Sequence, residues 1–161
     1  MSVENQQIVI IKAENKPGVL SKISSLCRRR RYNIKSLTAG TTHIKNISQV
    51  TLIFSENEDR MENIVNQIDK IVEVVSIKLV ESKDIIDKEL VLLVVKDDKI
   101  ADKILKNGIH NVSARVINTV GKCFVLEIVG EGREVDHILG DLDFEKDVVK
   151  MARSGLVALE L

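Results

Sequence analysis

Hydrophobic periodicity in residues 1–80 changes in an order that few small folds accommodate. The alternating runs typical of strands lie at 7–13, 34–42, 47–54 and 72–80. Helical spacing of apolar residues marks 19–30 and 58–70. The order is βαββαβ, which is typical of a ferredoxin-like unit with both helices on one face of the sheet. We expect the other face to be bare and, because it carries valine and isoleucine, to favour pairing with another copy.

A similar succession of predicted strands and helices begins after a charged segment, Glu81 to Lys88, which we interpret as a linker. Strands are predicted at 89–95, 112–120, 122–129, 148–153 and 156–159. Helices are predicted at 97–106 and 131–142. The fold class is therefore α+β, with a first domain at 1–80, a linker at 81–88 and a second small α/β domain of similar layout at 89–161.

Composition argues for a soluble protein with a substantial core. Hydrophobic residues make up 44% and charged residues 30% of the chain, and the net charge is zero. This balance predicts neither a nucleic-acid partner nor an anionic membrane partner. The apolar runs, such as Leu90 to Val95, are too short to cross a bilayer, and residues 1–6 do not resemble a secretion signal, so we expect a cytoplasmic protein.

No constellation in the chain predicts catalysis or metal binding. Cys27 lies on the apolar stripe of the first helix and Cys123 alternates with Val125 in a strand, which indicates reduced core thiols. Neither cysteine has metal-ligand spacing to the other or to the three histidines. We therefore expect no catalytic residue, no metal site and no cofactor in this chain. The run Arg28 to Arg31 could indicate RNA binding, but its position at a helix C-terminus favours a simpler role, offsetting the helix dipole.

The turn between the first strand and the first helix is the strongest candidate for a site. Pro17 suits the first turn of a helix, and Gly18 has no Cβ, so a ligand or a second chain could approach the backbone closely. The free N–H groups and the positive end of the helix dipole favour a carboxylate or phosphate there. The alternative is an ordinary strand-to-helix turn with nothing bound.

Three stretches resemble one family. The turn 14–20 resembles the ligand turn of ACT domains, which sense small molecules and usually amino acids. Residues 32–38 and 151–159 resemble the segment after the first helix and the end of the regulatory (small) subunit of acetolactate synthase, also called acetohydroxyacid synthase (AHAS). The chain departs from the family pattern at Arg31, where the family usually has Gly, and in the hairpin 39–46.

The resemblance implies a regulatory subunit without chemistry of its own. Its partner would be the catalytic large subunit, which carries thiamine diphosphate, Mg²⁺ and often FAD. The ACT domain would form a homodimer and would mediate feedback inhibition by a branched-chain amino acid, with valine favoured. Two alternatives remain open: a stand-alone ACT sensor that controls another enzyme or regulator, and an enzyme in its own right.

The resemblance and the turn together define a candidate effector site. Its residues are Asn15, Pro17, Gly18, Val19, Leu20, Asn33 and Ile34. Asn33 follows the first helix, so about 18 Å of helix separates it from Gly18 within one chain. We therefore expect Asn33 to come from the partner chain across a two-fold axis, an arrangement that the family resemblance also implies. The alternative for Asn33 is a helix C-cap in left-handed geometry.

Overall fold

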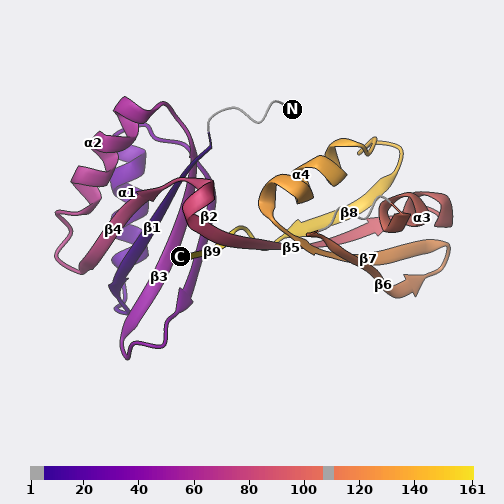
Figure 1. Cartoon of the computed structure of the whole chain (residues 1–161), viewed down its shortest axis with the longest axis horizontal. Coiled ribbons are helices and arrows are strands. Elements are labelled where there is room, and N and C mark those ends of the chain that lie inside the picture. Colours follow the sequence, from indigo (N-terminus) through magenta and orange to yellow (C-terminus); the bar gives the residue numbers. More distant parts are fainter. Residues whose placement is uncertain (1–5, 107–110) are drawn as a thin grey trace. The chain divides into compact units, whose positions relative to one another are not determined.

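The computed structural model describes residues 6–106 and 111–161, which form two compact units (Figure 1). One unit comprises the described residues up to Ile86 together with Ala158–Leu161, and the other comprises Asp87–Val157. The first unit has the predicted βαββαβ order. Its elements are β1 (Gln6–Glu14), α1 (Val19–Arg29), β2 (Ile34–Thr41), β3 (Ile47–Ser55), α2 (Glu58–Ile68) and β4 (Val74–Val80).

The sheet of the first unit is antiparallel, with strand order β2-β3-β1-β4. Both helices pack on one face of it, as predicted (Figure 1). Alternate residues of β1 point to that face, and the register pairs Val9 with Leu52 and Ile11 with Val50. The helices contribute Ile23, Leu26, Met61, Ile64 and Ile68 to the same core. The apolar residues that alternate along the strands and those spaced along one side of each helix therefore pack into a single hydrophobic core.

The prediction that the opposite face of this sheet is bare is wrong. Ile8, Ile10 and Ile53, which point to that face, are only 7%, 3% and 8% exposed. Ala158, far along the chain, is 2% exposed and belongs to the same unit. Its carbonyl oxygen accepts a hydrogen bond of 2.7 Å from the side chain of Gln49 on β3. The last residues of the chain therefore cover part of the face that sequence periodicity leaves empty.

Two short elements, a 3₁₀ turn and the final strand, are associated with the covering of this face. A 3₁₀ turn, η1 (Ser82–Asp84), leads into β5 (Ile85–Val95), and the final strand β9 (Val157–Glu160) pairs with β5. Ile85 is 6% exposed, so β5 begins there rather than at the predicted Glu89. The segment interpreted as a linker thus contains structured backbone, because Ile85 has apolar surface to bury.

The second unit repeats the order βαββαβ. Besides β5, its elements are α3 (Asp98–Lys106), β6 (Ser113–Val120), β7 (Cys123–Gly130), α4 (Gly132–Gly140) and β8 (Val148–Arg153). The strand order is β6-β7-β5-β8, again antiparallel. Side chains of α3 and α4 pack on one face, around Val91, Leu93 and Leu126. Each unit therefore buries one sheet face under two helices.

Candidate effector site

The turn between β1 and α1 is built on a left-handed glycine. Gly18 caps α1 with φ 89° and ψ −11°, a conformation that L side chains rarely adopt. It offers no side chain to the free N–H groups, and the first turn of α1 contains no acidic residue. A Cβ built on Gly18 would meet nothing within 4 Å. The positive end of α1 is therefore open to an approaching group.

At the N-termini of the other α-helices described, α2, α3 and α4, a side-chain oxygen accepts a hydrogen bond from the first turn of the helix. Asn57 accepts a hydrogen bond from the Arg60 N–H in α2, and Asp97 accepts one from the third residue of α3. Asp87 accepts a 2.8 Å bond from the N–H of Gly132, the first residue of α4. By contrast, within the described residues no acceptor is assigned to the N–H groups of Leu20 and Ser21 in α1. Those groups are available to a ligand oxygen.

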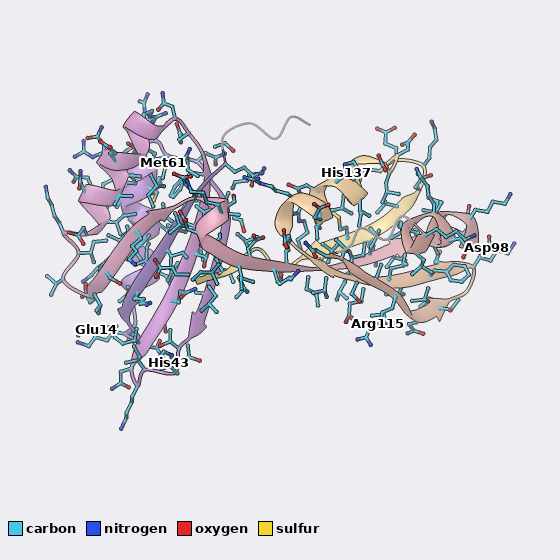
Figure 2. All side chains as sticks on the ribbon, in the orientation of Figure 1. Glu14, His43, Met61, Asp98, Arg115 and His137 are labelled. Atoms are coloured by element: carbon cyan, nitrogen blue, oxygen red, sulfur yellow. The ribbon has the colours of Figure 1, made fainter. Side chains whose placement is uncertain are left out.

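The turn is held in place by the hairpin that joins β2 and β3. The N–H of Asn15 donates a 2.8 Å hydrogen bond to the carbonyl of Asn46, whose φ is 63°. Figure 2 shows Glu14 and His43, which flank this contact in the sequence, at the same end of the sheet. A residue with left-handed backbone therefore lies on each side of this contact, Gly18 in the turn and Asn46 in the hairpin.

Two ion pairs surround the turn. The Lys16 ammonium lies 2.6 Å from Glu14, and this hydrogen bond raises the pKa of Lys16. The Lys22 ammonium lies 2.5 Å from Glu73, and the bond lowers the pKa of Glu73. Both lysines near the turn are therefore engaged with carboxylates. The positive potential at the turn itself is therefore that of the α1 backbone and not of an unpaired lysine.

The predicted site residues separate into exposed and core positions. Asn15, Pro17 and Gly18 are exposed, and Leu20 is 41% exposed. Val19 is 5% exposed and belongs to the hydrophobic core beneath the helices, so it supports the turn from behind rather than facing solvent.

Asn33 and Ile34 lie beyond the far end of α1. Asn33 is exposed, and Ile34 packs partly against the core. The 11 residues of α1 span about 16 Å, so one chain does not bring Asn33 to Gly18.

The left-handed residue that ends α1 is Arg31, with φ 57°, and not Asn33. The N–H of Tyr32 donates to the Cys27 carbonyl at 2.9 Å, and the N–H of Arg31 donates to the Arg28 carbonyl at 3.1 Å. This pair of bonds is the Schellman motif, in which glycine is usual at the left-handed position. The C-cap alternative for Asn33 is therefore wrong, because the chain has already turned out of the helix before reaching it.

Sequence reasoning missed a groove on the helix layer of the first unit, here called the α1–α2 groove. Its volume is about 500 Å³. It is lined by Ser21, Lys22, Ser25, Leu26, Arg29, Gln67, Lys70, Ile71, Val72 and Glu73. Val72, at the border of the groove, is 93% exposed. The sequence signal is two apolar residues, Ile71 and Val72, directly after the charged pair Asp69-Lys70 that follows α2.

The segment of the second unit that resembles the family's C-terminal motif has a structural role. Arg153 binds Glu89 through two hydrogen bonds of 2.8 and 2.5 Å and contacts Asp136 at 2.8 Å. The bonds to Glu89 raise the pKa of Arg153. Ser154 accepts from and donates to the backbone of Leu90. The motif therefore joins β8 to β5 and to α4.

Both cysteines are free in the described part of the chain, Cys27 buried and Cys123 partly buried. Burial raises the pKa of the Cys27 thiol, which favours its unreactive protonated form. Over residues 6–106 and 111–161 there is no cluster of His, Cys, Asp and Glu able to hold a metal ion. None of the helices described has the length and apolar character needed to span a membrane.

Two family models match the chain in succession. A model described as AHAS small subunit-like ACT domain matches residues 9–76, and one described as small subunit of acetolactate synthase matches residues 88–161. A probable acetolactate synthase small subunit from Archaeoglobus fulgidus is 29% identical over 153 residues, covering 94% of each chain. The acetolactate synthase small subunit of Mycolicibacterium smegmatis is 29% identical over 149 residues, covering 92% of this chain and 87% of that one.

A solved structure agrees with these matches. The acetolactate synthase small subunit from Thermotoga maritima superimposes with a TM-score of 0.81 at 25% sequence identity, covering 98% of both chains. Sequence and fold therefore agree over nearly the whole length, on both sides of the junction between the units. The chain belongs to the acetolactate synthase small-subunit family, and its first unit is an ACT domain of that family.

Proposed function

We propose that this chain is the regulatory subunit of an acetolactate synthase and activates a separate catalytic subunit without performing chemistry itself. The observation that carries the proposal is the match of both units, end to end, to small subunits of that enzyme. In this proposal thiamine diphosphate, Mg²⁺ and FAD belong to the catalytic partner, and cofactor chemistry takes place there. This chain contributes binding surfaces and a response to an effector.

The effector of the proposal is a branched-chain amino acid, with valine favoured, bound at the turn before α1. The unbonded N–H groups of Leu20 and Ser21 would bind the carboxylate at the positive end of the helix. The side chain of Asn15 can accept from the ammonium group. The exposed part of Leu20 offers apolar contact to a branched side chain. Pro17 and Gly18 keep the backbone open to approach.

The remaining candidates, Asn33 and Ile34, enter the proposed site from a second copy. β2 is an edge strand of eight residues with a single charged side chain, Lys35, and therefore has free backbone groups for pairing. Leu37 on this strand is 37% exposed. A homodimer formed through the ACT domain would place the start of β2 of one chain near the turn of the other. Each dimer would then have two equivalent sites.

Feedback inhibition in this proposal is a shift between two states of the complex. Valine lowers activity only if it binds the less active state more tightly than the active state. By linkage, the catalytic subunit must then change the affinity of this chain for valine by the same factor. A stand-alone ACT sensor would bind the amino acid without any such change.

Subunit complementation tests the site and the dimer together. Gly18→Asp removes the site at the turn, and Asn33→Ala removes the contribution from the other chain. In a mixed dimer one site carries both substitutions and the other carries neither, so calorimetry on the purified mixed dimer should recover about half the wild-type valine sites, and an equimolar mixture with free exchange about a quarter. Each variant alone should show weakened binding at all sites. Failure of the mixture to recover binding would argue against a site shared between chains.

Activity is measured separately. The chain is mixed with the catalytic subunit, and acetolactate formation is followed with and without valine. Activation by the wild-type chain supports the regulatory assignment. Acetolactate formation by the chain alone would contradict it. Valine binding without any effect on the catalytic subunit would favour the stand-alone sensor.

A further inference from the structure

Cations accumulate at the C-terminal end of α1 without counter-charges. The four residues Arg28–Arg31, here called the arginine cluster, are all exposed, and in the described part of the chain none of them makes an ion pair. α1 itself contains no carboxylate. The dipole of a helix amounts to about half an elementary charge at its end. Offsetting it therefore accounts for only a small part of this cluster.

The α1–α2 groove adjoins the cluster through Arg29, which lines it together with Lys70. Neither side chain has an ionic partner among the residues that the structure describes. Leu26 and Ile71 give the groove an apolar portion, and Val72 at its border is 93% exposed. The surface thus combines unpaired positive charge with apolar contact area, a composition that suits a protein partner with acidic and apolar side chains.

Aromatic contacts disfavour RNA as the occupant. Recognition of single-stranded RNA relies on exposed aromatic rings on which bases stack. The aromatic residue next to the cluster is Tyr32, whose ring already packs edge-on against Phe54 at 6.3 Å and beneath the Arg60 guanidinium at 4.8 Å. Its hydroxyl donates to the Arg60 carbonyl. The ring is therefore committed to the fold of the first unit and is not a free stacking platform.

We propose that the arginine cluster and the α1–α2 groove form a docking surface for an acidic segment of the catalytic subunit. Carboxylates of that segment pair with Arg29 and Lys70, and an apolar side chain of the segment covers Val72. This assignment rests on the proposed function for the identity of the partner. The groove borders the effector turn at Ser21, but Arg29, Lys70 and Val72, on which the assignment rests, are not residues of the proposed effector site.

The test is a charge reversal in the full chain, Arg29→Glu with Lys70→Glu, titrated against the purified catalytic subunit. We expect the affinity to fall at least about tenfold and the dependence of the affinity on salt to flatten. Val72→Asp probes the apolar contact independently and should also weaken the complex. Arg29, Lys70 and Val72 are all exposed. The thermal unfolding midpoint of each variant and its calorimetric response to valine should therefore match those of the wild type.

The matched control is Lys99→Glu with Lys122→Glu, which makes the same charge change at exposed lysines of the second unit. It should leave the affinity within about twofold of the wild-type value. Equal affinity for the wild type and for the Arg29/Lys70 variant would overturn the docking surface while leaving the proposed function intact. Binding of single-stranded RNA that the catalytic subunit does not displace would overturn it in favour of nucleic acid. Failure of the wild-type chain to bind the catalytic subunit would overturn both proposals.

Discussion

The first helices of the two units, α1 and α3, follow equivalent strands but begin in opposite ways. α3 is preceded by Asp97, whose carboxylate accepts a 3.1 Å hydrogen bond from the Ile100 N–H, and its first turn contains Asp98. α1 is preceded by Gly18 and has no acidic residue in its first turn. One βαββαβ layout therefore produces a helix end that is neutralised internally and a helix end that can attract an external anion.

This difference explains how a repeated fold can divide its functions. A capped helix gains stability from its own side chain, typically about 1 kcal/mol. An uncapped helix forgoes that stability and retains binding capacity at its N-terminus. The proposed effector site lies where the chain forgoes the cap. The same reasoning predicts that the second unit does not bind an amino acid at its equivalent turn.

The largest expected effect is that of Gly18→Asp. The new carboxylate occupies the approach to α1 and repels the carboxylate of the effector, so valine affinity measured by calorimetry should fall at least about tenfold. Activation of the catalytic subunit should persist. Gly18→Ala is the matched control, because it imposes the same backbone strain without the charge. Equal losses in the two variants would show that the backbone conformation, and not the charge, controls binding.

The next effect concerns α3. Asp97→Ala removes the cap and should lower the free energy of unfolding by about 1 kcal/mol in urea titration. Asp98→Ala, which removes a dipole interaction and no assigned hydrogen bond, should cost less. Neither substitution should change valine binding. A gain of valine binding in Asp97→Ala would mean that an uncapped helix is by itself sufficient for a site in this fold.

A smaller effect is expected at the other end of α1. Arg31 has φ 57°, where glycine is favoured, so Arg31→Gly should stabilise the protein by about 0.5–1 kcal/mol. Chemical denaturation measures the change. Arg30→Gly is the control, since Arg30 has φ −93° and its substitution should destabilise. Stabilisation by both variants would point to relief of charge repulsion in the arginine cluster instead.

The smallest effect is a pH dependence at the turn. The bond from Lys22 lowers the pKa of Glu73 below its ordinary value of 4.5, so this pair stabilises the folded chain above that pH. The contribution should disappear as the pH falls through the lowered folded-state pKa. Glu73→Gln should therefore reduce the difference in unfolding midpoint between neutral and acidic solution. An unchanged difference would show that the ion pair does not affect stability.

Local patterns determined much of this protein. Alternation of apolar residues and helical spacing predicted the βαββαβ order of both units, because these periods reflect which face of an element is buried. The sequence Pro17-Gly18 likewise predicted the strand-to-helix turn, because each residue has its own backbone preference. Element ends were less accurate: the helix predicted over 131–142 covers Gly132–Gly140, since frayed ends have no periodic signal.

Tertiary structure alone decided how distant segments meet. Nothing local to Ala158 indicates that its carbonyl accepts a bond from Gln49, or that residues near it help to cover Ile10. Arginine has no intrinsic preference for left-handed backbone, so φ 57° at Arg31 follows from the need of α1 to end where β2 must begin. Periodicity records whether a side chain is buried, but not which partner buries it, because burial is non-directional and the partner lies elsewhere in the chain.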